Sequence, residues 1–161
     1  MGVEVERKFL VNGDGWRAGA SAMPIRQGYL SMGMGATVRV RIAGHAAFLT
    51  IKSQSSGASR AEFEYPIPLA DALAMLADLC PPPHIEKTRH FVDVAGRAWT
   101  VDVFGGDNAG LVLAEVELGH PDDPVTLPDW VGAEVTHDPR YRNSALALAP
   151  QGGDSLDGEG V

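Results

Sequence analysis

Charged and apolar residues alternate in the stretch EVERK near the start of the chain. Successive side chains of a strand point to opposite faces, so Glu4, Glu6 and Lys8 share one face and apolar side chains take the other. Two carboxylates spaced in this way lie roughly 6–7 Å apart along the strand. This face either meets water or lines a site, and the remaining strands must decide between the two.

The same alternation recurs in six further strand-like stretches. A solvent-facing surface would contain more Ser, Thr and Gln and would scatter its lysines, whereas all three lysines of the chain belong to this in-phase set. Four charged residues or histidines break the pattern: Arg7, Arg26, Glu86 and His90. The in-phase acidic residues are Glu4, Glu6, Glu62, Glu64, Asp102, Glu115 and Glu117. The in-phase basic residues are Lys8, Arg39, Arg41, Lys52, Arg60, Lys87 and Arg89.

These residue types indicate a site for a metal ion and a polyphosphate. Arginine holds phosphate oxygens through paired hydrogen bonds, and lysine adds a compact positive charge. Carboxylates on one strand face provide the hard oxygen ligands that Mg²⁺ and Mn²⁺ prefer. Either group alone would be weak support, but acids and bases together describe both partners of a metal–triphosphate complex.

The elements that must position these side chains are mainly strands. Period-two patterning with short turns between the strands predicts an eight-stranded antiparallel closed β-barrel, mainly β within the α+β class, with a few flanking helices. Helical spacing predicts a helix at 69–79, which the prolines at 81–83 end, and a short helix around 139–148. The expected strands are 3–11, 25–30, 36–43, 47–53, 60–67, 85–94, 97–104 and 111–118.

If the charged faces point into the barrel, its interior is a polar, hydrated tunnel. Interleaved acids and bases would offset part of the free energy lost on burying so many charges. The apolar faces then turn outward and need cover from helices, from loops or from a second subunit, so a homodimer is one arrangement that fits.

Length and composition limit the remaining choices. The chain has 161 residues, which favours one domain, here 1–149, followed by an acidic, glycine-rich tail at 150–161 that is expected to be disordered. Net charge is −8, which disfavours general attraction to nucleic acid or to an anionic membrane. With Cys80 as the one cysteine and no stretch of membrane-spanning length, a soluble cytoplasmic protein is expected.

The chain resembles the CYTH superfamily, the triphosphate tunnel metalloenzymes. EVERK fits the E-x-E-x-K signature of that family, and the similarity continues through RVR at 39–41, EKTRH at 86–90 and DPRYRNSALA at 138–147. The resemblance implies an eight-stranded tunnel that binds triphosphates with Mg²⁺ or Mn²⁺. Among its branches, the chain looks most like the bacterial inorganic tripolyphosphatases, which implies hydrolysis of tripolyphosphate to pyrophosphate and phosphate.

The resemblance also implies roles for individual residues. Tyr29 stands where some members pair a tyrosine with the signature lysine. In the expected reaction a carboxylate among Glu4, Glu64 and Asp102 takes the proton of the attacking water, and the sequence does not choose among the three. The implied catalytic residues are Lys8, Tyr29, Glu4 and Glu64. The implied phosphate-binding residues are Lys8, Arg39, Arg41, Lys52, Lys87 and Arg89. The implied metal ligands are Glu4, Glu6, Asp102, Glu115 and Glu117.

Proteins with other activities could use the same set of phosphate-binding residues. A nucleotide or thiamine triphosphatase, a class IV adenylyl cyclase and a polyphosphate-binding module without catalysis all remain open. No base pocket can be identified in the sequence, which disfavours the cyclase, and binding alone would not need a full set of carboxylates. Arg140 and Arg142 either close one mouth of the tunnel or lie on a surface helix, and Arg60 with Glu62 could form an ion pair at the rim.

Overall fold

Strands make up most of this protein. The structure, a computed structural model, describes residues 2–33, 35–54 and 59–151. Of the predicted tail, residues 152–161 lie outside this described part, and the domain boundary at 149 stays a prediction. The strands are β1 Gly2–Val11, β2 Ser21–Ser31, β3 Ala36–Ala43, β4 Ala46–Ser53, β5 Ser59–Ile67, β6 Ile85–Val94, β7 Arg97–Phe104, β8 Val112–Glu117 and β9 Val131–Glu134. The helices are α1 Leu69–Asp78 and α2 Asn143–Leu148, with 3₁₀ turns η1 Gly106–Asn108 and η2 Pro139–Tyr141.

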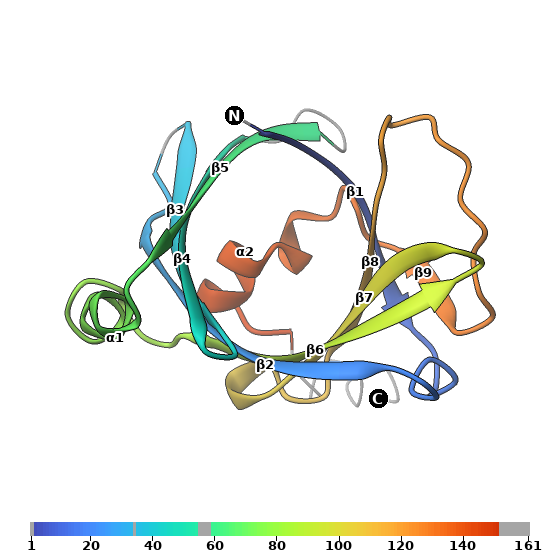
Figure 1. Cartoon of the computed structure of the whole chain (residues 1–161), viewed down its shortest axis with the longest axis horizontal. Coiled ribbons are helices and arrows are strands. Elements are labelled where there is room, and N and C mark those ends of the chain that lie inside the picture. Colours follow the sequence, from blue (N-terminus) through green and yellow to red (C-terminus); the bar gives the residue numbers. More distant parts are fainter. Residues whose placement is uncertain (1, 34, 55–58, 152–161) are drawn as a thin grey trace.

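Eight of the strands close into a ring (Figure 1). Neighbours pair antiparallel in the order β5-β4-β3-β2-β6-β7-β8-β1, and β1 closes the ring by pairing with β5. The first part of β1 faces β5, with Glu4 opposite Arg60, while its second part pairs with β8, where Lys8 lies opposite Glu115. The predicted eight-stranded antiparallel barrel is therefore confirmed.

The structure differs from the predicted elements at three places. Strand β2 begins at Ser21, earlier than the predicted 25–30. Strand β9, which pairs with the end of β1, was not predicted because its four residues follow a proline-rich stretch that looks like a loop. The single helix predicted around 139–148 is divided into η2 and α2, because Arg142 between them is extended with φ −70° and ψ 139°.

Much of the apolar packing lies outside the ring of strands. Helix α1 covers β2, β3 and β4 from outside, where Leu76 and Ala72 bury Val40 (Figure 1). Gly28 permits this contact, since a Cβ there would lie 2.8 Å from the Cβ of Cys80. A second outer cluster covers β1, β7 and β8 with aromatic side chains. The expectation that apolar faces turn outward under helices and loops is confirmed.

The inside of the barrel is apolar at one end, which the charge pattern did not indicate. Ile85, Phe104 and Leu113 share strand faces with the charged residues further along β6, β7 and β8, and Leu146 of α2 packs against them. Helix α2 lies within the outline of the ring when the molecule is viewed along the barrel (Figure 1). The polar tunnel therefore occupies only part of the interior, because apolar in-phase residues and α2 fill the rest. None of the helices in the described residues is long and apolar enough to span a membrane.

Candidate active site

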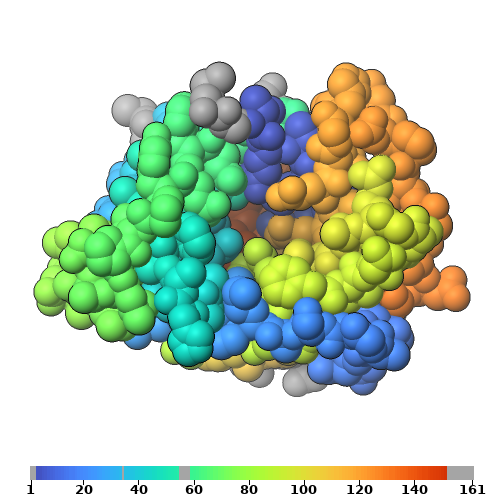
Figure 2. Space-filling view, viewed as in Figure 1, coloured from blue at the N-terminus to red at the C-terminus, as the bar shows by residue number. Residues whose placement is uncertain are grey.

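A cavity of about 490 Å³ opens at the centre of the barrel and is visible as the hollow in Figure 2. All eight strands of the ring and the start of α2 contribute to its wall. Among the described residues, eight basic and six acidic side chains line it, so the cavity carries an excess of positive charge inside a chain of net charge −8. Such an excess in a confined space attracts anions.

The alternation pattern brings its residues together in this cavity. The sequence-predicted site residues that line it are Glu4, Glu6, Lys8, Tyr29, Arg39, Arg41, Lys52, Glu64, Arg89, Glu115 and Glu117. The two that do not line it are Lys87 and Asp102. Tyr29 points inward as expected, and no hydrogen bond of its hydroxyl to another described residue is present, so its pairing with Lys8 stays a prediction.

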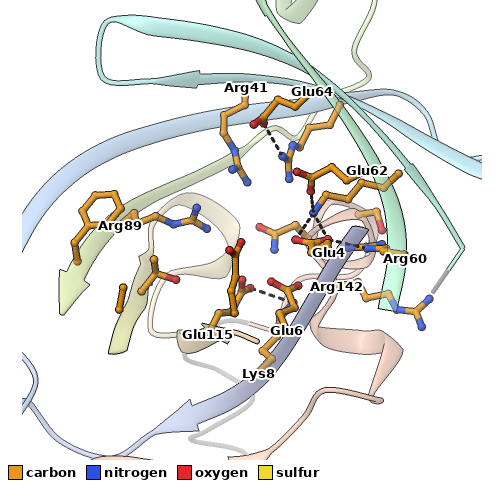
Figure 3. A pocket seen from close by; sticks show the side chains of 18 of the residues that line it. Glu4, Glu6, Lys8, Arg41, Arg60, Glu62, Glu64, Arg89, Glu115 and Arg142 are labelled. Atoms are coloured by element: carbon orange, nitrogen blue, oxygen red, sulfur yellow. Dashed lines mark hydrogen bonds and ion pairs between the residues drawn. The ribbon is translucent and has the colours of Figure 1, made fainter. Parts of the chain in front are cut away.

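Glu6 and Glu115 form the acidic side of the cavity, from the neighbouring strands β1 and β8 (Figure 3). Burial, with the adjacent carboxylates of Glu115 and Glu4, raises the pKa of Glu6 to about 9. Burial also opposes ionisation of Glu115, but Lys8, Arg89 and a hydrogen bond with Glu6 hold its pKa well below the ordinary value. The two carboxylates thus have opposite tendencies, since the pKa of Glu6 is raised and that of Glu115 is lowered.

Glu4 is held by two cations. Nζ of Lys52 donates to both of its oxygens at 2.9 Å, and Nε of Arg60 donates at 3.2 Å. Although burial alone would raise the pKa of Glu4, Lys52 and Arg60 keep it below the ordinary value. Lys52 also lies 3.3 Å from Glu62. Arg60 and Glu62, for which an ion pair at the rim was one interpretation, both line the cavity. There Arg60 pairs with Glu4 and Glu62 with Lys52, and among the described residues no ion pair joins Arg60 to Glu62 directly.

Arg39 and Arg41 project from β3 into the cavity as its basic side. Arg39 donates to Oγ1 of Thr50 at 3.3 Å, yet its buried Nε has no acceptor among the described residues. Burial, together with the charges of Arg39 and Arg89, lowers the pKa of Arg41 to about 9. Cations that crowd one another in this way are stabilised by an anion between them.

Asp102 lies behind the cavity wall, where it is 1% exposed. Its oxygens accept hydrogen bonds from Nε and Nη2 of Arg89 at 2.8 and 2.9 Å, and Nζ of Lys87 lies 2.8 Å away. Burial lowers the pKa of Lys87 to about 7, against the opposing effect of Asp102. Both oxygens of Asp102 are thus occupied by cations, so its predicted role as a metal ligand stays a prediction.

Comparison with known proteins identifies the family. The CYTH domain matches residues 2–150. This chain belongs to the CYTH family. A curated relative from Acetivibrio thermocellus, named inorganic triphosphatase, is 45% identical over 150 residues, and the match covers 93% of this chain and 96% of the relative. A second inorganic triphosphatase, from Nitrosomonas europaea, is 40% identical over 154 residues, covering 91% and 97%. The crystal structure of an inorganic triphosphatase superposes with a TM-score of 0.68 at 36% identity, covering 93% of this chain and 98% of that one.

Several residues in the wall of this CYTH cavity were not predicted from the sequence. Phe91 and Thr100 lie in phase with Arg89 and Asp102 but carry no charge, so the charge pattern gives no signal for them. Arg97 lies out of phase, near the start of β7, and its Nη1 donates to the backbone oxygen of Glu117 at 3.1 Å. Asn143 and Ser144 come from α2, where strand alternation gives no signal.

The acidic residues of this CYTH cavity fit a divalent cation in type and placement. Glu6, Glu115, Glu4 and Glu117 offer carboxylate oxygens from the adjacent strands β1 and β8, the donor class that Mg²⁺ and Mn²⁺ prefer. The charge of Glu115 helps to raise the pKa of Glu6, and a cation between the two carboxylates would relieve this repulsion. Among the described residues, however, no three acidic, histidine or cysteine side chains form a ready metal cage, because lysines and arginines hold several of the carboxylates.

Proposed function

We propose that this protein is a divalent-metal-dependent triphosphatase that hydrolyses inorganic tripolyphosphate to pyrophosphate and phosphate. The observation that carries the proposal is the cavity itself, in which an excess of basic side chains faces the carboxylates of Glu6 and Glu115. A linear triphosphate with its metal ion supplies the complementary charges. The names of the two relatives, both inorganic triphosphatases, support the choice of substrate.

The basic side of the cavity would hold the phosphate chain. Arg39 and Arg41 come from one strand and Arg89 from another, so their guanidinium groups can contact different phosphates of one chain. Lys8 and Lys52 lie nearer the carboxylates, where they can neutralise charge on the phosphoryl group that is transferred. Lys87, which is fully covered, supports this wall from behind.

Glu6 and Glu115 would hold the metal ion, with Glu4 and Glu117 beside them. A bound Mg²⁺ or Mn²⁺ would supply positive charge to the phosphate oxygens and would acidify a coordinated water. The chain's own residues then orient the substrate. Lys8 lies 3.5 Å from Glu115 and donates at 3.0 Å to the backbone oxygen of Tyr141, which fixes its ammonium between the carboxylates and the C-terminal segment.

Glu64 is the carboxylate best placed to accept the proton of the attacking water. All oxygens of Glu4 accept hydrogen bonds from Lys52 or Arg60, whereas Glu64 accepts one, from Thr50 at 3.0 Å, and its side chain is 41% exposed. Water would attack the terminal phosphorus, the bond to the bridging oxygen would break, pyrophosphate would leave, and the water's proton would pass to Glu64.

A substrate panel tests the proposal. Phosphate release is measured from tripolyphosphate, ATP and thiamine triphosphate, each with Mg²⁺ or Mn²⁺. Tripolyphosphate should give the highest kcat/KM. Preference for ATP or thiamine triphosphate would move the protein to those triphosphatases, and cyclic AMP formation would move it to the cyclases. Tight binding of tripolyphosphate without any hydrolysis would indicate a polyphosphate-binding module and would overturn the proposed reaction.

Two variants distinguish the loss of a carboxylate inside the cavity from the loss of a carboxylate on the outside of the barrel. Glu115→Gln should lower kcat/KM by about 10²-fold or more, with part recovered at higher metal concentration. Glu134→Gln is the matched control, since Glu134 is a carboxylate on the outer strand β9 bound by Arg7 at 2.7 Å. It should leave kcat/KM nearly unchanged. The cytoplasmic location and the homodimer stay predictions, and light scattering of the purified chain tests the second.

A further inference from the structure

A buried chain of uncharged polar groups runs behind the basic side of the cavity, and none of the roles assigned above involves it. Gln27 of β2 is 0% exposed. Its Oε1 accepts a hydrogen bond from Nε of Arg41 at 2.7 Å, and its Nε2 donates to Oδ1 of Asn143 at 3.1 Å. The same Oδ1 accepts a hydrogen bond from Nζ of Lys87 at 2.9 Å.

The chemistry of the partners fixes the orientation of both amides. A guanidinium can only donate, so the oxygen of Gln27 must face Arg41. The NH₂ group of Gln27 is then left for Asn143, and it finds an acceptor there. Each amide therefore has one arrangement that satisfies all of these groups, and the chain is locked in one direction.

This series of hydrogen bonds links the C-terminal helix α2 to Arg41 on the basic side of the cavity. Gln27 and Arg41 lie directly opposite each other on β2 and β3, so the Gln27 amide sets where the Arg41 guanidinium sits. Asn143 opens α2 and lines the cavity, and it restrains Gln27 from the other side. Loss of the Asn143 oxygen would free Gln27 to turn, and Arg41 would lose its fixed partner.

We propose that Asn143 is a positioning residue that acts through Gln27 to hold Arg41 in the orientation that binds phosphate. The inference rests on the proposed triphosphatase function, since it assigns Arg41 to the substrate. It adds a contribution of the C-terminal helix to substrate affinity that is separate from closing the end of the barrel. The neutral amide is suited to this place, because an aspartate would bring negative charge beside the bound anion.

A double-mutant cycle tests the proposal on the full chain. Asn143→Ala and Gln27→Leu should each raise KM for tripolyphosphate by about tenfold with a smaller change in kcat, as expected when a charged hydrogen bond to substrate loses its alignment. The double variant should be no worse than the more damaging single variant, because both interrupt one chain. Multiplying effects in the double variant would overturn the proposal. Should Gln27→Leu fail to fold, Gln27→Met serves in the same cycle, since its unbranched neutral side chain neither accepts from Arg41 nor donates to Asn143.

Asn108 provides the matched control. It is a buried asparagine that also anchors the C-terminal segment, through Nδ2 to the backbone oxygen of Leu146 at 3.2 Å, but it does not line the cavity. Asn108→Ala should lower the melting temperature at least as much as Asn143→Ala while leaving KM unchanged. An equal rise of KM in Asn108→Ala would mean that loosening of α2 explains the effect, and would overturn the proposal.

The outcomes also separate this inference from the proposed function. A wild-type protein that neither binds tripolyphosphate in chelator nor hydrolyses it with Mg²⁺ or Mn²⁺ would remove the function on which the inference rests. A wild-type protein that hydrolyses tripolyphosphate, with Asn143→Ala unchanged in KM, would overturn the role of Asn143 alone.

Discussion

Glu6 and Glu115 face each other from the neighbouring strands β1 and β8, and their pKa values move in opposite directions: burial raises the pKa of Glu6 to about 9, while Lys8 and Arg89 hold the pKa of Glu115 well below its ordinary value. Two carboxylates in contact repel unless a proton or a cation lies between them. The raised pKa of Glu6 favours a proton in this place when no cation is bound, so the pair links protonation, stability and metal binding.

Glu6→Gln should therefore raise the stability of the metal-free protein while it lowers activity. Glutamine keeps the hydrogen bond to Glu115 without a proton that can be lost. Wild-type Glu6 has a raised pKa, so its contribution to stability is present below the ordinary value of 4.5 and is lost as the pH rises toward 9. In chelator, the variant's melting temperature should match wild type near pH 4.5 and exceed it by several degrees at pH 8, since about 1 kcal/mol corresponds to ~2–4 °C in a domain of this size. A lower melting temperature of the variant at pH 8 would contradict the raised pKa of Glu6.

Removal of divalent cations should abolish phosphate release from tripolyphosphate. The carboxylates supply no positive charge of their own, and the basic side chains nearest to them are already paired with Glu4 and Glu115. Activity measured after dialysis against chelator should return with Mg²⁺ or Mn²⁺. Full turnover in excess chelator would exclude the proposed part of the metal.

Arg41→Ala and Arg7→Ala should differ sharply, although both remove an arginine from a strand of the barrel. Arg41 lines the cavity, so its loss should lower kcat/KM by about 10²-fold, with no recovery at high metal concentration. Arg7 lies on the outer face, where Nη2 donates to Glu134 at 2.7 Å. Its half-exposed ion pair contributes less than about 1 kcal/mol, so turnover should be nearly intact. Equal loss in both folded variants would contradict the alternation of β1.

Asp102→Asn should destabilise the fold, and added metal should not restore the variant. The change leaves Lys87 and Arg89 without their shared counter-charge in a site that is 1% exposed. Breaking a buried ion pair from one side costs about 3–5 kcal/mol, which thermal unfolding would detect. If higher Mg²⁺ concentration restored activity at an unchanged melting temperature, Asp102 would be a metal ligand after all.

Gly28→Ala should lower stability without affecting the reaction. The new Cβ would meet the Cβ of Cys80 at 2.8 Å and Cδ2 of Leu76 at 3.0 Å, on the outer face of β2 under α1. Such overpacking costs about 1–3 kcal/mol. Thermal unfolding should report this loss, while KM for tripolyphosphate at low temperature should equal that of wild type. A raised KM would show that α1 is coupled to the cavity.

The strands and most of the candidate site could be predicted because one physical rule governs both. Alternation places every second side chain on one face, so Glu6, Arg41 and Glu115 could be assigned to a common interior before the barrel was seen. The rule gives the face but not the depth along the barrel. Lys87 and Asp102 are in phase, yet they lie where the C-terminal helix and the strands cover them.

The remaining elements gave weaker signals. Strand β9 has four residues and takes its place from pairing with β1, which no local pattern reveals. Gln27 and Asn143 are uncharged, so their positions between two cations could not be inferred from residue type. Their importance depends on contacts between segments that are more than one hundred residues apart in sequence.

The pairing of Lys8 with Glu115 and of Lys52 with Glu4 makes the cavity resemble an ion exchanger loaded with its own counter-ions. A carboxylate that ligates a cation no longer holds its lysine, and a lysine that binds a phosphate no longer holds its carboxylate. Occupancy by either ligand thus prepares the groups that receive the other. Thermodynamic linkage requires this help to be reciprocal, so tripolyphosphate should tighten metal binding by the same factor by which metal tightens tripolyphosphate binding.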